Sequence, residues 1–191
     1  MGKKKLAVFA SGSGTNFEAI AQACADGRLD AEVALMVCDQ PGAAVVARAE
    51  RFGVPAFVAS PKEMGGKAAF EAEIVRRMDA LGIDLVCLAG YMRILSDVLL
   101  DAYGGRIINI HPSLLPAFRG AHAVEQAVAY GVKVYGITIH YVDAGMDTGK
   151  IIAQSCFTAK GNETLDEIET QIHALEHKLY PQVIQQLCKG E

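Results

Sequence analysis

The chain has 191 residues, of which 51% are hydrophobic and 21% are charged, and this composition is typical of one globular domain. Its net charge is -4 and its basic residues are dispersed, which argues against a surface for duplex nucleic acid. No apolar run approaches the ~18 residues that a membrane span requires, so we expect no membrane partner.

In the first half of the chain, short apolar runs alternate with segments of helical periodicity, which predicts an α/β fold. We predict strands over residues 6–10, 32–38, 55–58 and 84–89. We predict helices over residues 16–26, 43–52 and 67–81. The last of these strands is almost wholly apolar, as expected for a parallel strand covered by helices on both faces.

The second half continues this alternation and closes with two adjacent strands before a long helix. We predict strands over residues 106–110, 134–142 and 151–157, and helices over residues 124–130 and 164–187. We expect the last two strands to form a hairpin and Pro181 to kink or interrupt the final helix. The pattern predicts a single domain, residues 1–191, with a Rossmann-like, mostly parallel sheet, helices on both faces and a C-terminal antiparallel strand pair.

The cysteines indicate the compartment. All five are scattered without a CxxC pair, and three lie in apolar runs of strand length, where cysteine acts as a small hydrophobic residue. This pattern indicates a reducing compartment, and no apolar signal region follows the basic residues 3–5. We therefore expect a cytoplasmic protein.

A glycine-rich segment, Ser11–Asn16, follows the first predicted strand and opens the first predicted helix. Glycine lets the backbone approach a ligand closely, and free N–H groups at a helix start favour an anion. Phe17 occupies the place of the third glycine of the dinucleotide fingerprint, and no lysine is present to form a Walker A loop. The segment predicts a site for a monophosphate, with a plain strand-to-helix turn as the alternative.

Asn109 and His111 stand two residues apart at the end of a predicted strand, so their side chains project to the same side. An amide donor can hold developing oxyanion charge, and an imidazole moves protons near neutral pH. The pair predicts acyl transfer, with a strand-end histidine bonded to the backbone as the alternative. We expect one of the two acids in the glycine-rich loop 143–149, Asp143 or Asp147, to face His111, unless that loop is only a turn.

Residues 173–177 match the HxxEH pattern of inverted zinc proteases on one helix. Such a site needs a third protein ligand and a substrate cleft, and this helix is the last element of a small domain. We therefore favour a histidine pair on the helix surface, or a glutamate that lines a neighbouring pocket, over a zinc site.

Together these motifs resemble the folate-dependent formyltransferase family, and within it the enzymes that formylate glycinamide ribonucleotide in purine biosynthesis. The resemblance covers nearly the whole chain, in the same order, over residues 10–16, 88–95, 109–116, 136–149 and 176–181. The most specific of these segments reads Asn-Ile-His-Pro-Ser-Leu-Leu-Pro over residues 109–116. The segment 136–149 contains His140 and Asp147.

The resemblance implies direct attack of the ribonucleotide amine on 10-formyltetrahydrofolate through a tetrahedral intermediate, with no metal. It implies that the catalytic residues are Asn109, His111 and Asp147. It implies that the ribonucleotide is bound by Gly12, Ser13, Gly14, Thr15, Asn16 and Glu176. It implies that the folate is bound by Lys67, Met92, Arg93, Ile94, Leu95, Asn109, Val142, Asp143, Ala144 and Gly145.

On this interpretation the N-terminal half of the chain binds the phosphate and the ribonucleotide, and the C-terminal half binds folate and performs catalysis. Lys67 stands where relatives often carry arginine, and Val124 where several carry histidine. The partners are small molecules only, and we expect a monomer or a homodimer.

Three alternatives use the same core. Methionyl-tRNA formyltransferase carries a further domain for tRNA, and formyltetrahydrofolate deformylase usually carries a regulatory domain before the catalytic one, so the length of this chain disfavours both. A non-catalytic nucleotide-binding module would keep the glycine-rich segment but would not need Asn109, His111 and Asp147 together.

Overall fold

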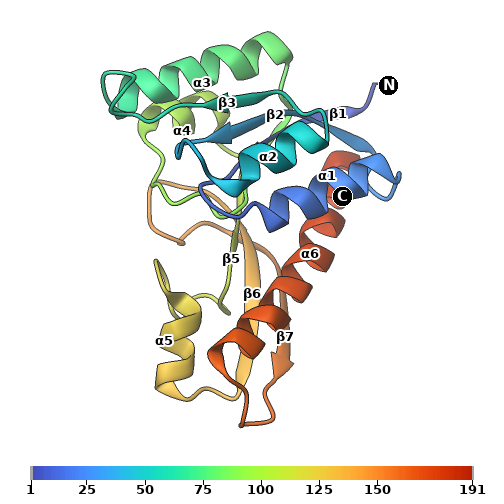
Figure 1. Cartoon of the computed structure of the whole chain (residues 1–191), viewed down its shortest axis with the longest axis vertical. Helices are drawn as coiled ribbons and strands as arrows, with labels where there is room; N and C mark the ends of the chain where they lie inside the picture. Colours follow the sequence, from blue (N-terminus) through green and yellow to red (C-terminus); the bar gives the residue numbers. More distant parts are fainter. Residues whose placement is uncertain (1, 191) are drawn as a thin grey trace.

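Seven strands and six helices build the part of the chain that the computed structural model describes, residues 2–190 (Figure 1). The strands are β1 (Lys4–Phe9), β2 (Ala31–Cys38), β3 (Ala56–Val58), β4 (Leu85–Leu88), β5 (Ile107–His111), β6 (Val134–Tyr141) and β7 (Ile151–Thr158). The helices are α1 (Thr15–Ala25), α2 (Ala44–Arg51), α3 (Lys67–Leu81), α4 (Asp97–Tyr103), α5 (Ala123–Tyr130) and α6 (Leu165–Lys189).

The strands form one sheet in the order β3-β2-β1-β4-β5-β6-β7. The first five run parallel, and β6 and β7 are antiparallel to their neighbours. Every residue of β4 is buried, as its apolar sequence predicts for a strand with helices on both faces. The predicted fold class, including the C-terminal hairpin, is therefore confirmed.

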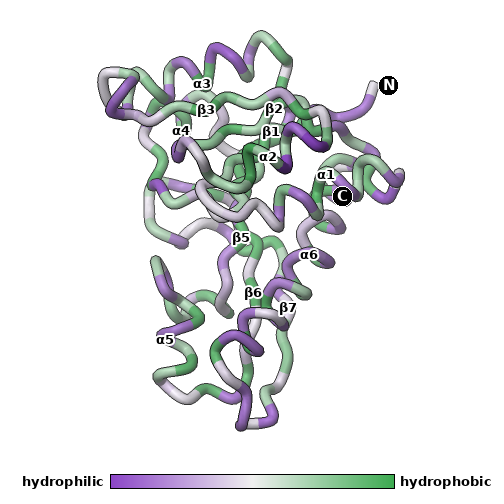
Figure 2. Tube along the Cα trace, in the orientation of Figure 1, coloured by the Kyte–Doolittle hydropathy of each residue, from purple (hydrophilic) through white to green (hydrophobic). Residues whose placement is uncertain are grey.

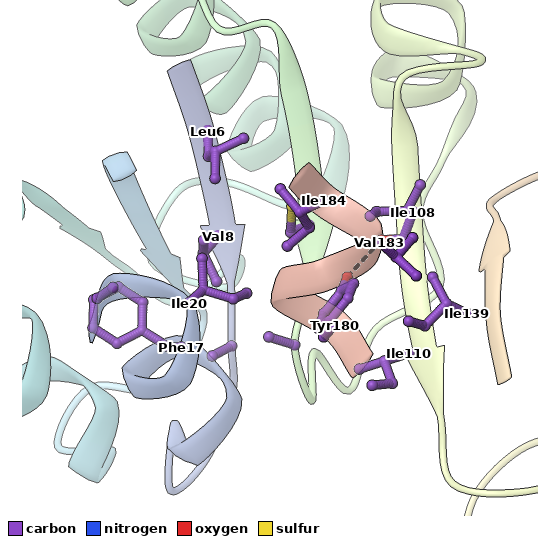
Figure 3. Close-up of a cluster of buried hydrophobic side chains, with 14 of the residues drawn as sticks. Leu6, Val8, Phe17, Ile20, Ile108, Ile110, Ile139, Tyr180, Val183 and Ile184 are labelled. Atoms are coloured by element: carbon purple, nitrogen blue, oxygen red, sulfur yellow. Dashed lines mark hydrogen bonds between the residues drawn. The ribbon is translucent and has the colours of Figure 1, made fainter. Parts of the chain in front are cut away.

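Hydrophobic side chains form one core on each face of the sheet. On one face, α1, α2 and α6 pack against the strands, and α3 and α4 cover the other face. Figure 3 shows Tyr180 and Ile184 of α6 between Leu6 of β1 and Ile108 of β5. Full burial of one such side chain contributes roughly 1.5–3 kcal/mol. Hydrophobic residues lie along β1 and β2, whereas hydrophilic residues lie on the outer turns of helices such as α3 (Figure 2).

The antiparallel half of the sheet extends beyond the parallel half. β4 ends at Leu88, which pairs with Asn109, but β5 continues to His111, and β6 and β7 extend further still, with α5 beside them (Figure 1). Because β6 runs back antiparallel to β5, its last residue, Tyr141, pairs with Ile108, close to the end of β4. The loop that follows β6 therefore begins beside the carboxyl ends of the parallel strands.

The structure differs from the sequence prediction in two places: an unpredicted helix is present, and Pro181 does not interrupt the final helix. The segment 97–103, to which we assigned no structure, is the short helix α4, which begins after Ser96. The backbone N–H of Ser96 donates to the buried carboxylate of Glu71 on α3, so a tertiary contact secures this helix start. Helix α6 is continuous through Pro181, because its neighbours on the helix pack into the core and outweigh the missing N–H of proline.

Helix α6 begins as the sequence predicts. Thr164 is its N-cap: the Thr164 hydroxyl accepts from the N–H of Glu167, and the Glu167 carboxylate accepts from the N–H of Thr164. The hydroxyl of Tyr180, further along, donates to the carbonyl oxygens of Leu88 at 2.9 Å and Ile108 at 3.3 Å. These bonds set the position of α6 along the sheet.

Candidate active site

Strands β5 and β6 bring three polar side chains to one face of the sheet. Asn109 pairs with His140 across the two strands, and the Nδ2 of Asn109 lies 3.2 Å from the Nε2 of His140. Ile108 and Ile110 point to the opposite face and lie in the core beneath α6. The two-residue period of a strand therefore directs Asn109 and His111 away from that core.

Asp147 completes this group from the loop between β6 and β7. One carboxylate oxygen lies 3.4 Å from the Nδ1 of His111, and the other lies 3.5 Å from the Nε2 of His140. The N–H of Gly120 donates to the same carboxylate at 2.8 Å. We call Asn109, His111, His140 and Asp147 the polar cluster. Its members are separated in the chain but share one face of the sheet.

The loop holds Asp147 in an unusual backbone conformation. Its φ is 52°, in the left-handed region that residues other than glycine rarely adopt. Two residues later, a side chain at Gly149 would overlap the carbonyl oxygen of Tyr141, so only glycine allows the loop to pass this close to β6. A strained residue between close contacts is typical of a functional loop.

The surroundings of Asp147 keep its carboxylate ionised. The hydrogen bond with His140 is the largest cause, and the Gly120 N–H and the nearby His111 ring add to it. Together they lower the pKa of Asp147 from 3.8 to about 2, although burial acts in the opposite direction. A fixed negative charge therefore faces both histidine rings at neutral pH.

Both ring nitrogens of His111 face acceptors. Nδ1 faces Asp147, and Nε2 lies 2.8 Å from the carbonyl oxygen of Phe118. A ring with a proton on each nitrogen satisfies both acceptors. Phe118 has a φ of 51°, so the carbonyl that orients His111 also comes from a left-handed residue. The ring is thus hydrogen-bonded to the backbone, as the alternative predicts, and it also faces the carboxylate of Asp147.

We call the segment Ser11–Asn16 the glycine loop. Two of its carbonyl oxygens point toward α2. The carbonyl of Gly12 accepts from the N–H of Val45, and that of Ser13 accepts from Nε of Arg48. Because C=O and N–H point in opposite directions across a trans peptide, the N–H groups of residues 13 and 14 point away from α2. They lie at the start of α1, where the helix dipole favours an anion.

Gly14 allows the glycine loop to pack against α2. Its φ is 75°, and an added Cβ would lie 2.5 Å from a methyl carbon of Val45 and 2.9 Å from the Cα of Val45. A side chain at this position would therefore collide with the backbone of the next helix as well as adopt a strained φ.

Glu176 lies on α6 with its carboxylate buried beside the glycine loop. It accepts from Nδ2 of Asn16 at 2.9 Å and interacts with Nδ1 of His173 at 2.9 Å. Within residues 2–190, two buried side-chain atoms near it have no partner, the Oδ1 of Asn16 and the Nε2 of His177. The hydrogen bond with Glu176 raises the pKa of His173, whereas burial lowers that of His177. The Oδ1 of Asn16 and the Nε2 of His177 therefore remain free to bind the polar groups of a ligand.

The segments expected to bind folate form an apolar surface. Met92 is 78% exposed, Ile94 is 55% exposed, and Met146 in the loop after β6 is 51% exposed. Tyr91 and Val142 pack against the same core cluster, so both segments are anchored on the same face of the sheet. Exposed apolar side chains at the edge of a polar site fit a ligand with an aromatic face.

Arg93 and Lys67, which are also expected to bind folate, do not contribute side chains to this surface. The guanidinium of Arg93 donates to Asp39 at 2.6 Å, so its side chain contacts the end of β2. Lys67 opens α3 with an exposed side chain, and the described residues offer it no hydrogen bond or ion pair. The structure thus gives no contact between Lys67 and the rest of the site.

Sequence reasoning missed the position of His140. It stands in one of the motifs, yet nothing in the local pattern assigns it a role; in the structure it is 2% exposed and contacts both Asn109 and Asp147. Its Nδ1 lies 2.8 Å from the carbonyl oxygen of Tyr141, which orients Nε2 toward the cluster. The available signal was the alternation of His140 with buried isoleucines in a predicted strand.

Residues 2–190 contain neither a membrane-spanning helix nor a group of side chains suited to a metal ion. No helix there is long and apolar enough to span a membrane. No three histidine, cysteine, aspartate or glutamate side chains in this range are grouped so that they could hold a metal ion.

Comparisons with known proteins agree with one another. Residues 4–184 match the family model described as formyl transferase. The chain is 57% identical to the phosphoribosylglycinamide formyltransferase of Bacillus subtilis (strain 168) over 184 residues, which is 96% of this chain and 94% of that protein. It is 35% identical to the Homo sapiens trifunctional purine biosynthetic protein adenosine-3 over 98% of this chain but only 19% of that protein.

Solved structures extend this similarity to three dimensions. The crystal structure of glycinamide ribonucleotide transformylase 1 from Geobacillus kaustophilus matches with a TM-score of 0.94 and 55% identity, covering 97% of this chain and 99% of that one. The phosphoribosylglycinamide formyltransferase of Bacillus halodurans matches with a TM-score of 0.94 and 52% identity, covering 98% and 97%.

Proposed function

We propose that this chain, which belongs to the formyl transferase family, transfers the formyl group of 10-formyltetrahydrofolate to the amine of glycinamide ribonucleotide. The observation that carries the proposal is the polar cluster: an amide, two imidazoles and an ionised carboxylate share one face of the sheet, and the glycine loop begins at the end of β1 nearby. In open α/β sheets, ligands bind at this edge.

The glycine loop is suited to the phosphate of the ribonucleotide. Backbone N–H groups of residues 12–16 at the start of α1 offer donors without a competing side-chain charge. The glycinamide end then lies toward Glu176 and the unpaired Oδ1 of Asn16, which accept hydrogen bonds from its N–H groups. The side chain of Asn16 therefore binds the glycinamide end of the ribonucleotide, and its backbone N–H binds the phosphate.

The folate is placed over the apolar surface of Met92, Ile94 and Met146. Their exposed side chains pack against its aromatic rings, and the backbone of residues 93–95 binds the polar edge of the pterin. Residues 142–145, which precede Met146 in the loop after β6, contribute to the same folate site. This arrangement presents the formyl carbon to the polar cluster.

The polar cluster then performs a direct transfer. The amine attacks the formyl carbon, and Asn109 and a protonated His111 stabilise the oxyanion of the tetrahedral intermediate. Asp147 stabilises the imidazolium and, directly or through water, helps carry the amine proton to the leaving folate nitrogen. The new N–C bond forms, the old one breaks, and the proton passes from one nitrogen to the other. No covalent enzyme intermediate and no metal take part.

A reconstituted reaction tests the proposal. The protein is mixed with 10-formyltetrahydrofolate and glycinamide ribonucleotide, and deformylated folate and formylated ribonucleotide are quantified together. Equal amounts of both products are expected, with no change after treatment with EDTA. Release of formate at the same rate without the ribonucleotide would show a hydrolase instead. No consumption of the folate in either mixture would contradict both activities.

The setting of this activity is part of the same proposal. We place the enzyme in the cytoplasm, as a monomer or a homodimer with small-molecule substrates and with no nucleic-acid or membrane partner. Its N-terminal half supplies the phosphate site, and its C-terminal half supplies catalysis and most of the folate surface. Size-exclusion chromatography with light scattering decides between the two oligomeric states.

A further inference from the structure

Asp39 is a buried carboxylate at the end of β2 that belongs to neither substrate site. It is 1% exposed and accepts three hydrogen bonds, from Oγ of Ser11 at 2.5 Å, Nε of Arg93 at 2.6 Å and Nε2 of Gln40 at 3.1 Å. A buried carboxylate is costly unless it is paired and hydrogen-bonded, and these three donors supply such partners.

Two of the three partners lie in the segments that hold the substrates. Ser11 opens the glycine loop after β1, and Arg93 lies in the folate segment after β4. The two segments also contact each other: Oγ of Ser11 accepts from the N–H of Met92 at 2.9 Å, and the N–H of Ser11 donates to the carbonyl of Gly90 at 3.1 Å. Asp39 thus connects both loops to a third strand.

The place of these contacts in the sheet is informative. The chain proceeds from β1 outward to β2 and β3, then returns to β4 on the other side of β1. The loops after β1 and β4 therefore flank the point where the strand order reverses, which is where open α/β sheets bind ligands. The Asp39 carboxylate spans this point through Ser11 and Arg93. An ion pair that only stabilised the core would join core elements rather than two binding loops.

From this geometry we infer that Asp39 is a positioning residue that holds the glycine loop and the folate segment in register for both substrates at once. The inference rests on the proposed function for the identity of those substrates. It also assigns the Arg93 side chain to Asp39, so that Arg93 serves folate through its backbone rather than its charge. Small displacements of positioned groups cost ~10–100-fold in rate or affinity.

Asp39→Asn tests the inference, because it keeps the size of the side chain and removes its charge. The matched control is Asp84→Asn. Asp84 also accepts from β1, through the N–H of Lys5 at 2.8 Å and Nζ of Lys4 at 2.9 Å, but at the amino ends of the strands, far along the sheet from the loops. We expect Asp39→Asn to raise KM for both substrates about tenfold, and Asp84→Asn to leave both KM values unchanged while lowering Tm.

A second measurement does not depend on turnover. Amide hydrogen exchange of the ligand-free protein is expected to become about tenfold faster in residues 11–16 and 90–95 of Asp39→Asn, and in neither segment of Asp84→Asn. If Asp39→Asn does not fold, Ser11→Ala replaces it, since this variant removes the shared hydroxyl and leaves the charge. Unchanged exchange in both loops, or a lower Tm with unchanged KM values, would overturn the inference. An inactive wild type with the expected exchange pattern would instead contradict only the proposed function.

Discussion

The glycine loop and the polar cluster hold their ligands with different parts of the polypeptide. The glycine loop offers backbone N–H groups, and its packing on α2 requires that Gly14 has no side chain. The polar cluster offers side chains, and three of its four members are oriented by a backbone group: His140 by the carbonyl of Tyr141, His111 by the carbonyl of Phe118 and Asp147 by the N–H of Gly120. The glycine loop depends on the absence of a side chain at Gly14, and the polar cluster depends on the chemical identity of its side chains.

This difference predicts how each region responds to substitution. Added atoms should damage the glycine loop through a collision that also lowers stability. Removed atoms should damage the polar cluster through the reaction, because its members lie beside the core rather than within it. The following variants separate these effects, beginning with the largest.

Asn109→Ala and His111→Ala should each lower kcat by ~10²–10³, which is typical for the loss of one oxyanion donor. KM for the ribonucleotide should change little, because neither residue contacts the glycine loop. Single-turnover rates with 10-formyltetrahydrofolate measure the effect, and Asn162→Ala, which removes an exposed amide before α6, is the control. A near-normal rate in either variant would remove that residue from the mechanism.

Gly14→Ala should destabilise the protein by about 3 kcal/mol and raise KM for the ribonucleotide, because the new Cβ collides with Val45. Gly27→Ala is the matched control at the other end of α1. Gly27 has a similar φ of 78°, but an added Cβ there meets nothing within 4 Å, so a cost of about 1 kcal/mol is expected. Urea unfolding of both variants separates the collision from the strained φ. Equal losses would show that packing on α2 is unimportant.

Asp147 should make stability depend on pH in a defined window. Its pKa is about 2 in the folded protein, against an ordinary value of 3.8, so its stabilising effect is complete above about pH 4 and is lost as pH falls through 2. The wild type should exceed Asp147→Asn by about 2 kcal/mol at pH 6 and by almost nothing near pH 2. Urea unfolding of both proteins across this range tests the prediction. A difference that does not change with pH would mean that the carboxylate charge is not stabilised.

Thr164→Ala should cost only about 1 kcal/mol, since it removes the N-cap of α6 far from either site. Thermal unfolding should show a small decrease in Tm with unchanged kcat. Thr170→Ala, in the exposed interior of the same helix, should leave Tm nearly unchanged. A loss of activity in Thr164→Ala would indicate that the start of α6 positions Glu176.

Much of the fold is predictable because the pattern that encodes it is local. The alternation of apolar runs and helical periodicity locates β1, β2, β4 and the long helices to within a few residues. Helix α4 is not predictable in this way, because seven residues are too few to show a clear helical period. A hydrogen bond to Glu71 from another helix stabilises its start. Pro181 misleads for the opposite reason: a local rule predicts a break, and packing of α6 on the sheet outweighs it.

By itself the sequence determined the alternating elements, the glycine loop after β1 and the chemical types that an acyl transfer requires, because these depend on residues that are neighbours in the chain. Only the tertiary structure decided which groups meet. Asn16 and Glu176 are 160 positions apart, His140 faces Asn109 through the register of two antiparallel strands, and Asp39 joins two loops from a third strand. Such contacts follow from strand register and burial in the packed sheet, which no local pattern encodes.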